Sequence, residues 1–110
     1  MTSIIIKTNF EAKHYWSDAP VEVAFLRNPH RHIFYVEVKM EVKELDREIE
    51  FFMLKKILDD YININYKGAE FAMSCEMIAG GIKAYLENKY QDRQISVSVF
   101  EDNENGAICE

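Results

Sequence analysis

Three histidines are the residues of this chain best suited to bind a metal ion. They are His14, His30 and His32, and the sequence contains no other histidine. Three neutral imidazoles that leave a fourth position open are typical of catalytic zinc sites. A lone histidine on an apolar face is more often a hydrogen-bonded core residue, so the metal hypothesis requires all three to meet in space.

Two segments of alternating hydrophobicity carry these histidines. Even positions are mainly apolar in residues 4–14 and again in residues 30–42, which is typical of strands with one buried face. His14 ends the first segment, and His30 and His32 begin the second, all on the apolar side. If the two strands pair as a hairpin, the imidazoles meet at one end of it. The sequence therefore predicts that His14, His30 and His32 bind Zn²⁺.

The remaining elements follow from changes in periodicity. Apolar residues three or four apart predict an amphipathic helix over residues 49–62, and a second helix runs from an N-cap at Ser74 to about residue 90. Strands are expected over residues 95–101 and 107–109. The order strand, strand, helix, helix, strand, strand predicts an α+β fold in which two helices cover one face of a four-stranded antiparallel sheet. Because open sheet edges invite pairing, we expect a homo-oligomer.

Length and charge narrow the class of protein. The 110 residues fit a single domain over 1–110. A net charge of −6 makes nucleic acid and membrane surfaces poor partners. The longest apolar run near the start, residues 4–6, is far shorter than a signal peptide or membrane span requires, so we expect a cytoplasmic protein. Cys75 and Cys109 are expected to be free thiols.

Several motifs together resemble the 6-pyruvoyl-tetrahydropterin synthase family, which includes the 6-carboxy-tetrahydropterin synthases of queuosine biosynthesis. That family carries F-x-A-x-H, then H-G-H entering a strand, V-D-F-x-x-L-K and P-T-x-E at helix starts, and V-x-E near the C-terminus. The matching segments are Phe10-Glu11-Ala12-Lys13-His14, His30-Arg31-His32, Ile49-Glu50-Phe51 with Leu54-Lys55, Ser74-Cys75-Glu76 and Val99-Phe100-Glu101. The resemblance covers nearly the whole chain.

The resemblance implies a tunnelling fold (T-fold) whose subunits join as trimers or hexamers, and a zinc-dependent carbon-oxygen lyase. It implies that the three histidines bind zinc and that Glu101 and Glu76 contact the substrate, Glu101 as the anchor of a pterin ring. The start of the family segment L-D-H-x-x-L-N resembles Leu58-Asp59-Asp60, which makes Asp59 a catalytic candidate, whereas Asp60 stands where the family has a histidine. The implied substrate is 7,8-dihydroneopterin triphosphate or a related dihydropterin.

Two departures from the family pattern concern the general base. Leu26 stands where the family has its catalytic cysteine, and Arg27 stands where a variant branch has a glutamate. Cys75 at a helix start, or Asp18 and Glu22 in the loop, are the substitutes to consider, although small or solvated residues are common at such places. The alternatives are a non-catalytic relative that binds a pterin, purine or nucleotide between subunits, and a structural oligomer whose histidines have lost their role.

Overall fold

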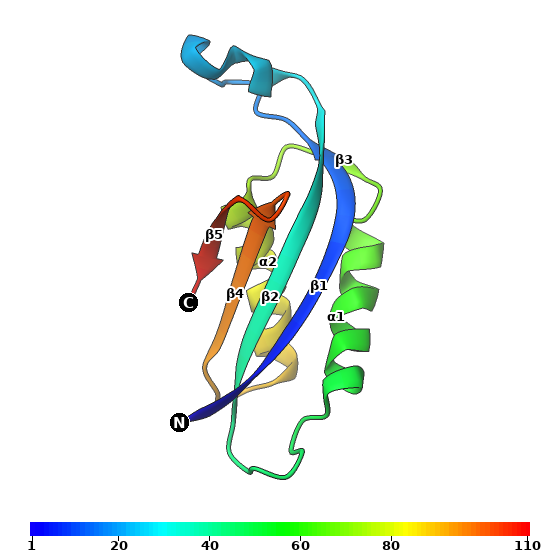
Figure 1. Ribbon diagram of the computed structural model, residues 1–110, viewed down its shortest axis with the longest axis vertical. Helices are drawn as coiled ribbons and strands as arrows, with labels where there is room; N and C mark the ends of the chain where they lie inside the picture. Colours follow the sequence, from blue (N-terminus) through cyan, green and yellow to red (C-terminus); the bar gives the residue numbers. More distant parts are fainter.

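A long antiparallel hairpin forms the centre of the computed structural model, which describes residues 1–110 (Figure 1). Strand β1 (Thr2–His14) pairs along its whole length with β2 (His30–Val42). The buried side chains of both strands lie at even positions, as the alternation predicts. The hairpin therefore turns one face of the sheet toward the core.

Three further strands complete the sheet in the order β3-β1-β2-β4-β5. Strands β4 (Ile95–Glu101) and β5 (Asn105–Cys109) pair antiparallel, β4 with β2 and β5 with β4. Strand β3 (Glu70–Phe71) runs parallel to the end of β1. The sheet is therefore five-stranded and mixed, where the sequence predicted four antiparallel strands. A strand of two residues is too short to produce a periodic signal.

Two long helices begin where side chains cap them. Helix α1 (Phe51–Asn65) starts after Glu50, whose carboxylate accepts from the backbone N–H groups of Phe52 and Met53. Helix α2 (Cys75–Lys89) starts after Ser74, whose hydroxyl accepts from Met77 N–H. The predicted N-cap at Ser74 is confirmed. No helix of the chain combines the length and the apolar character that a bilayer span needs.

Both long helices pack on one face of the sheet, which carries the even positions of β1 and β2 and the odd positions of β4. Helix α1 lies against β1, and α2 lies against β4 and β5 (Figure 1). Apolar side chains from both helices and from three strands form one continuous core. The structure is therefore an α+β fold, with the core closed between one sheet face and the two helices.

The segment between β1 and β2 forms an arm beyond the end of the sheet (Figure 1). A 3₁₀ helix, η1 (Val21–Arg27), lies within it, where the sequence predicted only a loop. Trp16 N–H donates to Leu26 carbonyl O at 2.8 Å and closes the base of the arm. Because it is only seven residues long and contributes no side chain to the core, this helix leaves little periodic signal.

Candidate metal centre

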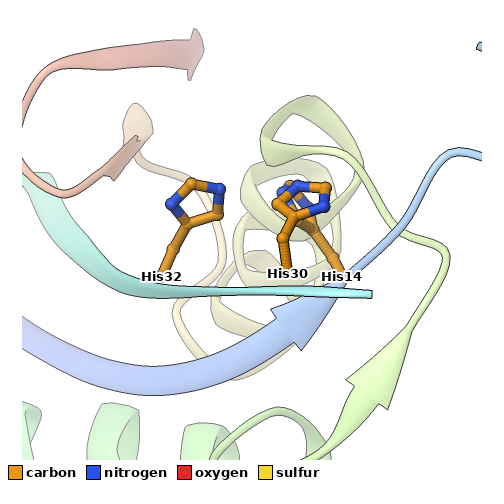
Figure 2. Close-up of side chains that lie close together, drawn as sticks. All are labelled: His14, His30 and His32. Atoms are coloured by element: carbon orange, nitrogen blue, oxygen red, sulfur yellow. The ribbon is translucent and has the colours of Figure 1, made fainter. Parts of the chain in front are cut away.

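The hairpin register brings the three histidines together at one end of the sheet. His14 lies directly opposite His30, and His32 is two residues further along β2 on the same face. Figure 2 shows all three side chains on the same side of the two strands. One ligand nitrogen from each ring lies within 4.8 Å of the other two. The predicted convergence of these residues is confirmed, and they lie close enough to bind a metal ion.

Backbone carbonyl groups orient two of the imidazoles. Nδ1 of His14 lies 2.9 Å from the carbonyl oxygen of Met73, in the segment before α2. Nδ1 of His30 lies 2.9 Å from the carbonyl oxygen of Asn28, in the arm. Because a carbonyl oxygen only accepts, each Nδ1 must carry the proton. In the neutral ring, Nε2 is then left with a free lone pair, which is the form that binds a metal.

A carboxylate orients the third ring. Nδ1 of His32 donates to Asp102 Oδ2 at 2.7 Å, while the other oxygen of Asp102 accepts from Ile33 N–H at 3.0 Å. These hydrogen bonds hold the pKa of Asp102 below its ordinary value, with the bond from His32 as the larger cause. Histidine ligands of zinc commonly donate their second nitrogen to a carboxylate in this way.

One nitrogen of the cluster lacks the hydrogen-bond partner that buried polar atoms normally have. Nε2 of His30 is buried and has no hydrogen-bond partner. Burial lowers the pKa of His14 below its ordinary value, despite its hydrogen bond to Met73 and the charge of Glu101. A bound cation would satisfy Nε2 of His30, and the lowered pKa of His14 favours the neutral ring, which is the form that binds a metal.

Glu101, the predicted ring anchor, lies against the same cluster. Its Oε2 is 2.9 Å from His14 Nε2 and 3.8 Å from His32 Nε2. Its side chain leaves the sheet beside Phe34, on the face that carries the histidines. The structure therefore brings Glu101 together with the three predicted metal ligands.

A cleft of about 430 Å³ opens beside this cluster. The arm, the start of α2 and the turn after β4 form its walls. Its apolar lining includes Trp16, Leu26, Met73 and Met77. Its ionisable lining comprises His14, Tyr15, His30, Cys75, Glu76 and Glu101. No lysine or arginine lines it. The cleft is thus partly apolar and carries negative charge, as suits a flat ligand that offers hydrogen-bond donors.

The two candidates at the start of α2 differ in exposure. Glu76 is exposed and lines the cleft, within reach of a ligand. Cys75 is buried, and burial raises the pKa of its thiol to about 12, with smaller contributions from the charges of Glu101 and Glu76. Desolvation therefore outweighs the favourable field of the helix start. Cys75 is a neutral thiol at pH 7 and is not prepared to act as a base.

Asp59 lies apart from the cleft. It is on α1, and its Oδ1 accepts from the hydroxyl of Thr8, on β1, at 2.6 Å. Thr8 is six residues before His14 on an extended strand, so the two are about 20 Å apart. Neither Asp18 nor Glu22 lines the cleft. The structure does not bring any of these three carboxylates together with the histidines.

Sequence reasoning missed the role of Asp102. It follows Glu101 in a turn where Asp102 and Asn103 both have positive φ, at 52° and 57°. Aspartate and asparagine tolerate that conformation better than most residues, so the sequence Asp102-Asn103 is typical of a turn. The contact with His32 depends on strand register, which composition does not reveal.

Comparison with known proteins identifies no family. No protein-family model matches the chain, and no curated protein matches its sequence.

Proposed function

We propose that this chain is a zinc-dependent tetrahydropterin synthase-like protein that acts on 7,8-dihydroneopterin triphosphate or a related dihydropterin. One observation carries the proposal: the Nδ1 atom of each imidazole is hydrogen-bonded to an oxygen, and one ligand nitrogen of each ring lies within 4.8 Å of the other two. That arrangement suits zinc, which favours nitrogen ligands and a tetrahedral site. The motif resemblance supplies the class of substrate.

The chain's own residues would bind and orient such a ligand. The Glu101 carboxylate, available in the cleft, can accept two hydrogen bonds from the amino group and ring N–H of a pterin. Glu76 can accept a further one from the rim, and Trp16 and Leu26 offer apolar contact to the ring. Bound zinc would supply Lewis acidity that lowers the pKa of a ligand hydroxyl.

An oligomer of the T-fold type, a trimer or hexamer, fits the free edges of the sheet. Strand β3 covers β1 only at Lys13 and His14, and Gly68 N–H donates to Glu11 carbonyl O, so the outer edge of β1 is unpaired from Thr2 to Phe10. Strand β5 forms the opposite edge. Because long open edges favour pairing with another chain, we expect these edges to meet between subunits. Light scattering that shows a monomer at micromolar concentration would contradict this part of the proposal.

A non-catalytic function in the same cleft is favoured by a different observation. The only thiol in the cleft is neutral, and no lysine or arginine is present to balance a triphosphate. A relative that binds an uncharged pterin or purine through Glu101 needs neither a base nor a cation there. This alternative predicts metal and ligand binding without a product.

Metal analysis of purified protein, combined with turnover assays, tests both functions. We expect about one zinc per chain in the wild type and none in His30→Ala, because one of three ligands is lost. Lys13→Ala is the matched control, since Lys13 is exposed beside His14 but its side chain lies on the opposite face.

Dihydroneopterin triphosphate is then incubated with each protein and followed by mass spectrometry. A zinc-dependent product that His30→Ala does not form supports the lyase. Binding without a product, measured by calorimetry with a pterin and a purine, supports the non-catalytic function. A His30→Ala protein that retains full zinc would show that the metal site is wrongly assigned.

A further inference from the structure

We infer that Glu101 is a fourth metal ligand, which completes a three-histidine, one-carboxylate site while the cleft holds no ligand. The inference rests on the metal site of the proposed function and adds a role for Glu101 that its use as a ring anchor does not include. The juxtaposition of Glu101 Oε2 with the Nε2 atoms of His14 and His32 carries it.

The distances match those between ligands of one metal ion. Zinc binds imidazole nitrogen and carboxylate oxygen at about 2.0–2.2 Å, so two ligands of a tetrahedral site lie about 3.4 Å apart. Glu101 Oε2 lies 2.9 Å from one Nε2 and 3.8 Å from the other, on either side of that value. The carboxylate oxygen therefore lies near ligand distance from two of the three imidazoles, and a small movement of the side chains would bring it to a shared metal ion.

The same contact needs a cation, either a proton on Nε2 or a metal ion. Nδ1 of His14 and Nδ1 of His32 already donate to other acceptors, so the nitrogen that faces the carboxylate is Nε2, which in an unprotonated ring offers only a lone pair. Glu101 has no ion pair with a lysine or arginine. A shared metal ion would turn this set of facing acceptors into a coordination sphere, and the carboxylate would also offset part of the ion's charge.

The backbone holds Glu101 at this position from both sides. It is the last residue of β4, opposite Phe34 of β2. In the turn that follows, Asp102 N–H donates to Ile33 carbonyl O at 2.8 Å, and Glu104 N–H donates to Glu101 carbonyl O at 2.9 Å. Because the backbone at Glu101 is already fixed, only the side-chain rotamer has to be selected for the carboxylate to reach the metal. The entropic cost of ligation is therefore low.

Ligation by Glu101 has a consequence for the cleft. Four protein ligands would fill a tetrahedral site, so a ligand hydroxyl that binds a four-coordinate zinc ion would take the place of the carboxylate. The Glu101 carboxylate would then be available to accept hydrogen bonds from the ring. Glu101 would thus pass from the metal to the ligand when the cleft fills.

Metal binding without any pterin tests the inference directly. Wild type and Glu101→Gln are titrated with Zn²⁺ in competition with a chromophoric chelator, and with Co²⁺, whose visible absorption reports coordination number and ligand type. Glu104→Gln is the matched control, because it removes the same charge from the turn that follows Glu101, at an exposed position outside the cleft lining. Thermal unfolding of each metal-free protein checks that the variants fold.

We expect Glu101→Gln to bind Zn²⁺ at least about tenfold more weakly and to show an altered Co²⁺ spectrum, since losing a ligand should cost at least as much as losing a residue that hydrogen-bonds to a ligand. Glu104→Gln should match the wild type in both. Equal affinity and an unchanged spectrum in Glu101→Gln would overturn the inference while leaving the histidine site intact.

The outcomes separate the inference from the proposed function. A wild type that binds no metal overturns both. The expected metal data, in a protein that neither binds nor converts a pterin, support the Glu101 ligand and reject the proposed function.

Discussion

The two ends of the β1–β2 hairpin use the same face of the sheet for opposite purposes. At one end Ile4 lies opposite Met40, and both belong to the apolar core or pack against it. At the other end His14 lies opposite His30. Between them Phe10 and Phe34 stack with ring centroids 5.2 Å apart. One continuous strand ladder thus passes from aliphatic side chains to imidazoles.

The two ends of the hairpin also differ in how their charged and polar groups are paired. Near the aliphatic end, Arg93 pairs with Glu48 at 2.8 Å and donates to the carbonyl of Glu41, so its charge is balanced. At the histidine end, His30 Nε2 has no partner and Glu101 faces two ring nitrogens. The aliphatic end is complete as it stands, whereas the histidine end is incomplete without a cation. Unsatisfied polar atoms on an otherwise satisfied core face indicate a binding site.

Met40→Ala should lower the free energy of unfolding through the aliphatic end alone. It is the largest effect expected among the predictions that compare the two ends. Met40 is fully buried, and truncating such a side chain leaves a cavity that costs about 3 kcal/mol of unfolding free energy. Zinc affinity should stay unchanged, because the site is ten residues away along β2. Urea denaturation and a chelator competition measure the two quantities.

Met77→Ala is the matched control for Met40→Ala, because Met77 is 61% exposed and lines the cleft. It should lower the unfolding free energy by no more than about 0.5 kcal/mol. A large loss of zinc affinity in Met40→Ala would show that the two ends are coupled.

Asp102→Asn should weaken the histidine end without affecting the core. Removing the carboxylate that orients His32 should lower zinc affinity by about 10- to 100-fold, as is usual when a residue that hydrogen-bonds to a metal ligand is replaced. Asparagine accepts the positive φ at this position, so the turn should be retained. The chelator competition used for Glu101 gives the affinity.

Asp92→Asn provides the comparison for Asp102→Asn. Asp92 is exposed and also has a positive φ, of 59°, but it lies in the turn before β4, away from the histidines. It should bind zinc like the wild type. If Asp102→Asn did the same, the carboxylate would be a turn former with no part in the site.

Cys75 should behave as a core residue although it lines the cleft. Its modification by a thiol reagent should be the smallest effect of this series. Because burial raises the pKa of its thiol to about 12, almost no thiolate forms at pH 8. In a Cys109→Ser background, iodoacetamide should therefore modify the native protein very slowly and the urea-unfolded protein readily. Mass spectrometry measures the modification. If the native protein reacts rapidly, Cys75 becomes a candidate base again.

The parts of the fold that repeat a pattern were predictable from the sequence. Alternation over residues 4–14 and 30–42 gave both the strands and the buried parity of His14, His30 and His32. Helix α2 was predictable because Ser74 caps it and its apolar side chains recur at helical spacing. Strand β3 and helix η1 were not, since short elements held by tertiary hydrogen bonds have no period of their own.

By itself the sequence determined which side chains share a face, because parity and helical spacing are local properties of a chain with fixed backbone geometry. It could not determine what those side chains meet. The carbonyl of Met73 at His14, the carboxylate of Asp102 at His32 and the burial of Cys75 each join residues far apart in the chain. Only the tertiary structure decided these contacts, because strand register and helix placement result from packing of the whole core.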